Sequence, residues 1–143
     1  MRDKVVIITG AARGLGQKYA IEFAKIGSKV VFADINSCID TENKVKEITT
    51  EFLNLSLDVT NYDSCISLIT SAKEKFKRVD VLVNNAALYG ALKSNRFEDI
   101  DEDQWDRAMN VNVKGMWNCC RAVAPVMREQ KSGSIINIAS LAA

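Results

Sequence analysis

A glycine-rich stretch near the N-terminus has the residue types and spacing to bind a phosphate group. It reads Thr-Gly-Ala-Ala-Arg-Gly-Leu-Gly over residues 9–16. Gly10, Gly14 and Gly16 would let the backbone pass close to a ligand. The N-terminus of a following helix would offer unpaired N–H groups and a positive dipole end to a pyrophosphate. The stretch lies between a β-branched run and an apolar helical pattern, the context that a dinucleotide site requires. A tight turn that only packs a helix against a strand is the alternative.

A carboxylate at the end of the second apolar run indicates which dinucleotide the site would bind. Asp34 follows Lys-Val-Val-Phe-Ala, residues 29–33. At that place a carboxylate can accept hydrogen bonds from the adenosine ribose hydroxyls of NAD, whereas the 2′-phosphate of NADP would meet a like charge. Arg13, in the glycine-rich stretch, argues for NADP. We expect NAD, because a mobile arginine does not easily cancel repulsion from an acid at the ribose. A solvated loop acid is the alternative for Asp34.

The elements that must position these groups alternate between strand and helix patterns. Apolar runs predict five strands, over Val5–Ile8, Lys29–Ala33, Phe52–Leu57, Val79–Val83 and Ser134–Ala139. Helical spacing predicts four helices between them. This alternation predicts a single α/β domain over residues 1–143, with a doubly wound parallel sheet in the strand order 3-2-1-4-5.

The helical segments differ in the strength of their patterns. The first ends at Gly27, and the second, around residues 38–50, has only Ile39, Val45 and Ile48 to bury. Thr60 and Asp63 resemble a capping box for the third. The last runs from Asp101 to about Lys131, with Gly115 and Pro125 expected to bend it. Its periodic apolar residues are Trp105, Met109, Val113, Met116 and Cys120.

Composition and charge exclude several other classes of protein. The chain has 143 residues, 48% hydrophobic and 26% charged, as in an ordinary soluble domain. A net charge of +1 gives no field that would attract nucleic acid or a membrane. The N-terminus resembles neither a signal peptide nor a membrane span, so we expect a cytoplasmic protein. The absence of histidine removes histidine-based triads and most zinc sites, and we expect no metal. Free, buried thiols are expected at Cys38, Cys65, Cys119 and Cys120.

Further residues, taken in order, show a resemblance to a known family. The glycine spacing is Thr-Gly-x-x-x-Gly-x-Gly, Asp58-Val59 ends the third predicted strand, Asn84-Asn85-Ala86-Ala87 ends the fourth, Asn112 lies in Asn-Val-Lys-Gly, and Ser140 ends the fifth. In these motifs the whole chain resembles the short-chain dehydrogenase/reductase family, which has a Rossmann fold. The resemblance implies cofactor-binding roles for Gly10, Arg13, Gly14, Leu15, Gly16, Asp34, Ile35, Asp58, Val59, Asn85, Ala86 and Ala87.

The resemblance also implies individual roles. Asp58 would accept from the adenine amino group and Val59 would supply backbone and apolar contact, unless Asp58 is only a solvated strand-end acid. Asn112 would interrupt its helix and hold a proton-relaying water, and Ser140 would orient the substrate carbonyl or alcohol. A plain surface asparagine and a structural serine are the alternatives for these two catalytic positions.

The first asparagine of the Asn84–Ala87 stretch would steady the central sheet, and the residues after it would line the cofactor. Ala87 departs from the family, which usually has glycine at that position. Alanine is tolerated there unless the residue needs a positive φ.

The family's acid/base, a tyrosine followed four residues later by lysine, normally lies beyond the serine. Tyr89 and Lys93 have that spacing, but their loop precedes the long helix and we reject them. The 143 residues therefore resemble the N-terminal portion of an enzyme, truncated before the Tyr-x-x-x-Lys helix and the C-terminal strands and helices that follow it.

We expect an NAD(H)-dependent oxidoreductase that interconverts a small secondary alcohol and a ketone. At full length it would be a homodimer or homotetramer. These 143 residues alone would show little turnover. A non-catalytic NAD-binding or interaction module is the first alternative. Another Rossmann-type enzyme, such as a methyltransferase, is a weaker one, against which the Asn-Asn-Ala motif and Asn112 argue.

Overall fold

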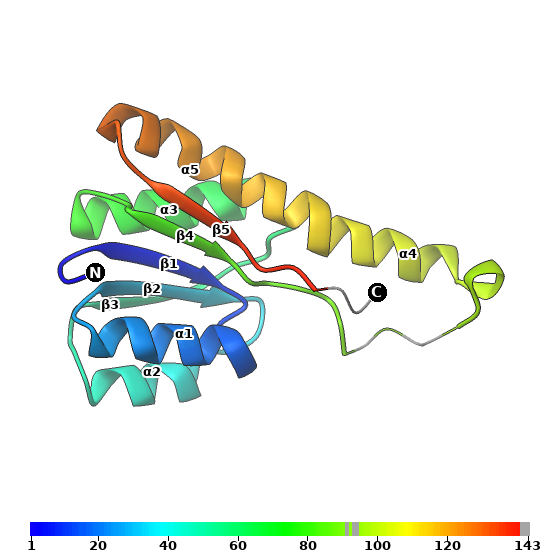
Figure 1. The fold of residues 1–143 in the computed structure, drawn as a ribbon, viewed down its shortest axis with the longest axis horizontal. Helices are drawn as coiled ribbons and strands as arrows, with labels where there is room; N and C mark the ends of the chain where they lie inside the picture. Colours follow the sequence, from blue (N-terminus) through cyan, green and yellow to red (C-terminus); the bar gives the residue numbers. More distant parts are fainter. Residues whose placement is uncertain (91, 93–94, 141–143) are drawn as a thin grey trace.

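The computed structural model describes residues 1–90, 92 and 95–140, and it contains one five-stranded parallel sheet. The strand order is β3-β2-β1-β4-β5, with every neighbouring pair parallel, which confirms the predicted topology. The carboxyl ends of the strands all meet at one edge (Figure 1). The strands are β1 (Val5–Thr9), β2 (Lys29–Asp34), β3 (Phe52–Ser56), β4 (Val81–Asn84) and β5 (Ser134–Asn137).

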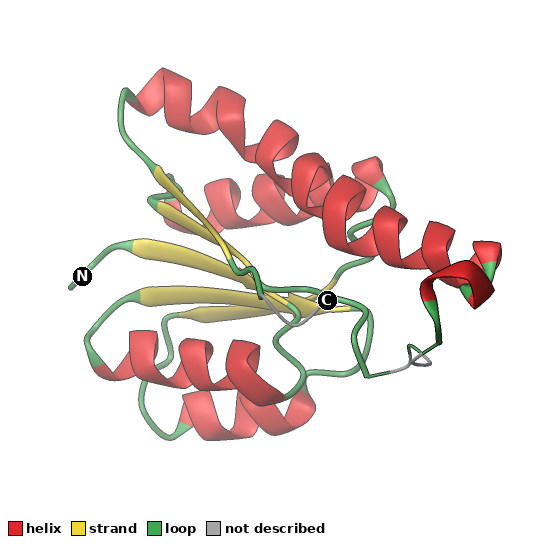
Figure 2. Ribbon diagram, turned by 45° about the vertical axis from the view of Figure 1, so that its right-hand side comes forward, coloured by secondary structure: helices red, strands yellow, loops and turns green. Residues whose placement is uncertain are grey.

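Helices cover both faces of the sheet, as doubly wound topology requires. On one face lie α1 (Gly14–Lys25) and α2 (Ile39–Lys46), and on the other lie α3 (Tyr62–Phe76) and α5 (Met116–Gln130), an arrangement visible in Figures 1 and 2. The chain reaches α5 through a short 3-10 turn (Phe97–Asp99), α4 (Glu102–Met109) and a π-helical segment, Asn110–Gly115.

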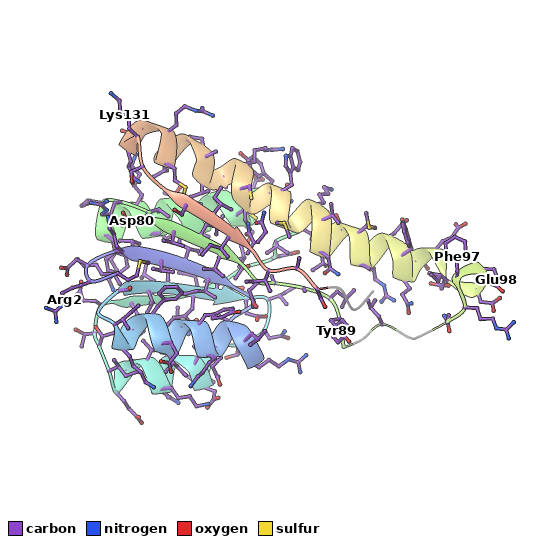
Figure 3. The ribbon with its side chains drawn as sticks, in the orientation of Figure 1. Arg2, Asp80, Tyr89, Phe97, Glu98 and Lys131 are labelled. Atoms are coloured by element: carbon purple, nitrogen blue, oxygen red, sulfur yellow. The ribbon has the colours of Figure 1, made fainter. Side chains whose placement is uncertain are left out.

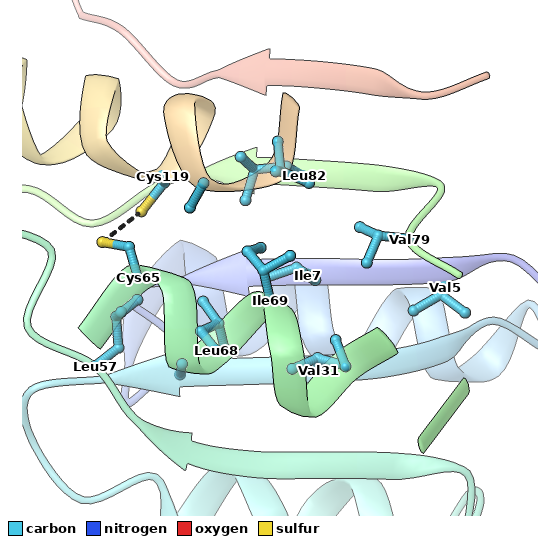
Figure 4. Close-up of a cluster of buried hydrophobic side chains, with 14 of the residues drawn as sticks. Val5, Ile7, Val31, Leu57, Cys65, Leu68, Ile69, Val79, Leu82 and Cys119 are labelled. Carbon is cyan, nitrogen blue, oxygen red and sulfur yellow. Dashed lines mark hydrogen bonds between the residues drawn. The ribbon is translucent and has the colours of Figure 1, made fainter. Parts of the chain in front are cut away.

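Two apolar cores result from the alternation of side chains along the strands. Val5 and Ile7 point to the core beneath α3 and α5, whereas Val6 and Ile8 belong to the core beneath α1 and α2. Figure 4 shows the first core, in which the Sγ atoms of Cys65 and Cys119 lie 3.6 Å apart. All five residues of β1 are buried, which explains why its sequence shows a continuous apolar run.

Two expectations, one for α3 and one for α2, were wrong in detail. Asn61, not Thr60, caps α3: its side chain accepts hydrogen bonds from the N–H groups of Asp63 and Ser64. Of the three apolar residues expected in the second helix, Val45 is buried in α2, Ile39 is exposed, and Ile48 is exposed beyond the end of α2. The capping prediction failed because asparagine, like threonine, is a good cap, and the chain turns into the helix one residue later.

The last helix is interrupted at Gly115, as predicted, but not at Pro125. Its interruption is the π-helical segment Asn110–Gly115, whereas Pro125 lies inside α5 without ending it. Three of its periodic apolar residues, Trp105, Met109 and Val113, are exposed rather than buried. The pattern therefore marks a side of α4 and the π-segment that the described residues leave uncovered.

The four cysteines are free thiols, and three of them are buried, with Cys120 partly buried. Within residues 1–90, 92 and 95–140, no helix has the length and apolar character needed to span a bilayer.

Candidate functional site

The glycine turn between β1 and α1 lies at the carboxyl edge of the sheet. Gly10 and Gly14 have φ values of +68° and +60°, which glycine adopts without strain. A Cβ on Gly10 would lie 2.7 Å from the Cα of Ala86, and one on Gly16 would collide with the Gly10 carbonyl and the Asn85 amide. No heavy atom lies within 4 Å of the corresponding position on Gly14. Gly10 and Gly16 are thus required by packing, while Gly14 presents open backbone to a ligand.

The N-terminus of α1 has the character of an anion site. Arg13, which precedes the helix, makes no capping side-chain hydrogen bond, and the first turn contains no acidic residue. The N–H groups of that turn and the helix dipole therefore favour a negatively charged ligand. Leu15 is 60% exposed beside them, although its spacing also fits the apolar pattern of the helix.

Thr9 and Asn85 hold the glycine turn against the end of β4. The Asn85 side chain donates to the carbonyls of Thr9 and Gly10, both at 3.0 Å. The Thr9 hydroxyl accepts from the backbone N–H groups of Asn85 (3.1 Å) and Ala86 (3.0 Å). Thr9 is not among the predicted site residues, because its only signal in the sequence is its place before the first glycine.

Asn84 has a different role from its neighbour. It donates from Nδ2 to Asn137 Oδ1 (2.9 Å) and to Cys120 Sγ (3.2 Å), and so joins β4 to β5 and α5. After the two asparagines, Ala86 is partly buried and Ala87 is exposed. Ala87 has a negative φ, so alanine is tolerated at position 87, where the family usually has glycine. Each asparagine of the pair thus braces a different part of the sheet edge.

Asp34 ends β2 beside the glycine turn, as predicted. Its Oδ2 accepts from the Ala12 N–H (3.0 Å), and its Oδ1 accepts from the backbone and side chain of Asn36 (2.9 and 3.1 Å). The carboxylate is half-buried and fixed by these hydrogen bonds rather than freely solvated. Ile35, the next residue, is 69% exposed.

The Cys38 thiol lies near Asp34. Burial, and secondarily the charge of Asp34, raise the pKa of this thiol to about 11. Cys38 is therefore a neutral thiol at physiological pH.

The Asp58–Thr60 turn follows β3 at the same edge. Asp58 Oδ1 accepts from the Thr60 N–H (2.9 Å) and hydroxyl (2.7 Å). Val59 is only 8% exposed and its side chain belongs to the core, so this residue can offer a ligand mainly its backbone.

Asn112 lies in the π-helical segment, consistent with the expected interruption of the helix. Its Oδ1 accepts from the Leu88 N–H (2.7 Å) and its Nδ2 donates to the Leu88 carbonyl (3.1 Å). The side chain is partly buried and clamps the loop after β4 to the long helix, so it is not a plain surface asparagine. π-Helical turns of this kind are frequent at functional sites.

Ser140 is exposed and follows the carboxyl end of β5, which lies at the same edge of the sheet as the carboxyl end of β1 (Figure 1). Tyr89 is also exposed, in the loop after β4 (Figure 3). Lys93 lies outside the described residues. The structure thus brings the predicted residues to the carboxyl edge, the place where open α/β sheets bind their ligands.

A separate groove lies between α3 and α5, away from this edge. Its volume is about 420 Å³, and its apolar lining includes Ile66, Ile69, Ala122 and Val126. None of the predicted site residues lines it. No cluster of potential metal ligands occurs among the residues that the structure describes.

Comparison with known proteins agrees with this geometry. The family model for short chain dehydrogenases matches residues 4–143, so the chain belongs to the short chain dehydrogenase family. Members of this family are oxidoreductases, and the domain is a Rossmann fold. Over 99% of its length, the chain is 37% identical to an uncharacterised oxidoreductase of Staphylococcus saprophyticus, covering 56% of that protein.

A second curated relative is the 3-oxoacyl-(acyl-carrier-protein) reductase of Thermotoga maritima, with 35% identity over 99% of this chain and 57% of the relative. A similar solved structure is a short chain dehydrogenase/reductase from Burkholderia phymatum in complex with NAD. It has a TM-score of 0.91 and 30% identity, over 98% of this chain and 50% of that one. The chain spans a little over half the length of the curated relatives it matches.

Proposed function

We propose that the protein is an NAD(H)-dependent oxidoreductase that transfers a hydride between nicotinamide C4 and a small secondary alcohol or ketone. The observation that carries this proposal is the Asp34 carboxylate, held 3.0 Å from the Ala12 N–H at the rim of the glycine turn. A carboxylate so placed can accept bonds from the adenosine ribose, and it repels a 2′-phosphate.

The cofactor would be held by residues from four strand ends. The open backbone at Gly14 and the N-terminus of α1 would bind the pyrophosphate, with Arg13 and Leu15 beside it. Asp34 and Ile35 would contact the ribose, Asp58 and Val59 the adenine, and the stretch Asn85–Ala87 the remainder. When bound, NAD supplies the hydride chemistry, and the protein supplies binding, orientation and electrostatics.

Two further residues would serve the substrate side. Ser140 would orient the carbonyl or alcohol through its hydroxyl, and Asn112 would hold the water of a proton relay. Neither replaces the family's tyrosine, and residues 1–143 contain no Tyr-x-x-x-Lys after Ser140. We therefore expect the 143-residue polypeptide by itself to bind NAD with little or no turnover.

Calorimetric titration of NAD and NADP tests the cofactor assignment. Wild-type protein should prefer NAD. Asp34→Ala should lower the affinity for NAD by about tenfold to a hundredfold, because hydrogen bonds to a charged group contribute about 1.5–3 kcal/mol. Asp63→Ala, at the solvent-exposed start of α3, is the matched control and should leave both affinities unchanged. An equal or stronger affinity of the wild type for NADP would overturn the assignment.

The alternative is a binding or interaction module without catalysis, which would use the exposed side of the long helix. Trp105, Met109, Val113 and Trp117 recur every four residues and are 42–53% exposed. Either a homodimer or homotetramer of a cytoplasmic enzyme, or a module with another partner, would cover these side chains.

The protein produced from the native gene separates the two readings. Turnover of an alcohol with NAD that Ser140→Ala abolishes supports the enzyme. The intact mass shows whether the polypeptide extends far enough past residue 143 to include a further helix. NAD binding without turnover of any alcohol or ketone supports the module. Light scattering on the same sample gives the oligomeric state.

A further inference from the structure

Asn118 is a buried polar residue that the proposed function does not use. It lies in α5 and is 2% exposed. Its Nδ2 donates to the carbonyl of Val59 at 2.9 Å and to the carbonyl of Thr60 at 3.3 Å. Because both partners are acceptors, the amide nitrogen must face them. One side chain thus binds two successive carbonyls of the turn that follows β3.

The same turn is held on its other sides as well. A Cβ on Gly115 would lie 2.6 Å from Cγ2 of Val59, so the π-segment packs directly against that residue. The Cys65 thiol also faces the Val59 carbonyl, at 3.7 Å, and Cys65 lies against Cys119 from α5 (Figure 4). The turn is therefore fixed from both α3 and the long helix before any ligand binds.

We propose that Asn118 is a positioning residue for the adenine end of the cofactor, acting through the carbonyls of Val59 and Thr60. This inference rests on the proposed NAD site, in which the turn at Asp58 and Val59 contacts adenine. Without the Asn118 amide, the Thr60 carbonyl loses this donor, the Val59 carbonyl keeps only the weaker contact from the Cys65 thiol, and the turn gains freedom that ligand binding must then remove. Pre-ordering of a binding loop raises affinity by lowering that entropic cost.

The long helix offers a matched control at its other end. Gln130 also holds backbone groups with its amide: it donates to the Val79 carbonyl at 2.8 Å and to the Ser132 carbonyl at 3.1 Å, and it accepts from the Val79 N–H at 2.9 Å. That clamp lies at the amino edge of the sheet, opposite the cofactor site. Asn118→Leu and Gln130→Leu each remove an amide clamp from α5, but only the first borders the proposed adenine contact.

The test compares ligands that contain or lack the adenosine half of NAD. Calorimetry with NAD and ADP-ribose, and ligand-observed NMR with nicotinamide mononucleotide, are carried out on wild type and both variants. Asn118→Leu should lower the affinity for NAD and for ADP-ribose about tenfold, or about 1.4 kcal/mol. It should leave the affinity for nicotinamide mononucleotide unchanged. Gln130→Leu should change none of the three. Should Asn118→Leu not fold, Asn118→Ala removes the amide donor with a smaller side chain and gives the same comparison.

The outcomes separate this inference from the function on which it rests. Wild-type protein that binds neither NAD nor ADP-ribose overturns the proposed function, and the inference with it. Normal wild-type binding with unchanged ADP-ribose affinity in the Asn118 variant overturns the inference alone. An equal loss of all three ligands, or an equal loss in Gln130→Leu, also overturns it, because the role would then be structural.

Discussion

The two edges of the sheet hold their acidic residues in different ways. At the amino edge, Asp80 is 5% exposed and forms ion pairs. At the carboxyl edge, Asp34 and Asp58 are half-buried and accept hydrogen bonds from N–H and hydroxyl groups. Asp80 accepts from Arg78 at 2.5 and 2.8 Å, from Lys4 at 3.1 Å and from the Val5 N–H at 3.0 Å. Figure 3 shows Asp80 and Tyr89 at these opposite edges.

The difference between the two edges separates stability from binding. Burial acts to raise the pKa of Asp80, but its hydrogen bonds to Arg78, Val5 and Lys4 outweigh that effect and hold the pKa below its usual range. The Asp80 charge is thus matched within the fold. At the carboxyl edge the acids are held by neutral donors, beside the exposed apolar side chains of Leu15 and Ile35. That edge keeps both charge and apolar surface for a ligand.

The largest expected effect comes from breaking the carboxyl edge at its most crowded point. Gly16→Ala places a methyl group against the Gly10 carbonyl and the Asn85 amide, so the turn or α1 must shift. Overpacking of this kind costs about 1–3 kcal/mol, and we expect NAD affinity to fall more than a hundredfold. Denaturant unfolding and calorimetric titration measure the two effects. Gly90→Ala, with no atom within 4 Å of the added methyl, is the control and should change neither.

A change at the amino edge should affect stability without affecting binding. Asp80→Asn removes the charge that Arg78 and Lys4 contact, and we expect a loss of about 2 kcal/mol in the free energy of unfolding. Its NAD affinity should equal that of the wild type. A fall in NAD affinity comparable to that of Gly16→Ala would show that the two edges are not independent.

The same variant predicts a pH dependence of stability. Because the folded-state pKa of Asp80 is lowered, its contribution is fully present above the unfolded-state value of about 4 and is lost as pH falls through the folded pKa. The difference in unfolding free energy between wild type and Asp80→Asn should therefore be constant near neutrality and shrink below about pH 4. A difference that grows with acidification contradicts the assignment.

The smallest effect is expected at a third place, on the outer helical layer. Lys73 and Glu129 form an ion pair at 2.6 Å between α3 and α5, with 44% and 70% of their side chains exposed. Solvent screens such pairs, which contribute little to stability. Glu129→Gln should leave the melting temperature and NAD affinity unchanged within error, and a clear change in either would show that α3 and α5 are coupled at their surface.

Local patterns were sufficient to predict the strands, their order and Asp34 at the end of β2, whereas Asp58, Asn85, Asn112 and Ser140 were singled out by the family resemblance. The β-branched run of β1 and the glycine turn after it are contiguous in sequence, so their periodicity indicates them directly. The orientation of the long helix was harder to predict. An apolar stripe shows which face of a helix is apolar, but not whether another element packs against that face. Trp105 and Val113 are exposed because no described element packs on their side.

The sequence by itself determined the doubly wound fold, the glycine turn and the acid at the end of β2, because each depends on neighbouring residues and a fixed spacing. The tertiary structure alone decided which polar groups meet. Asn118 binds Val59, and Asn85 binds Gly10, across 59 and 75 positions of the chain. No local pattern contains such pairs, since they arise only when the sheet brings its strand ends together and α5 packs over α3.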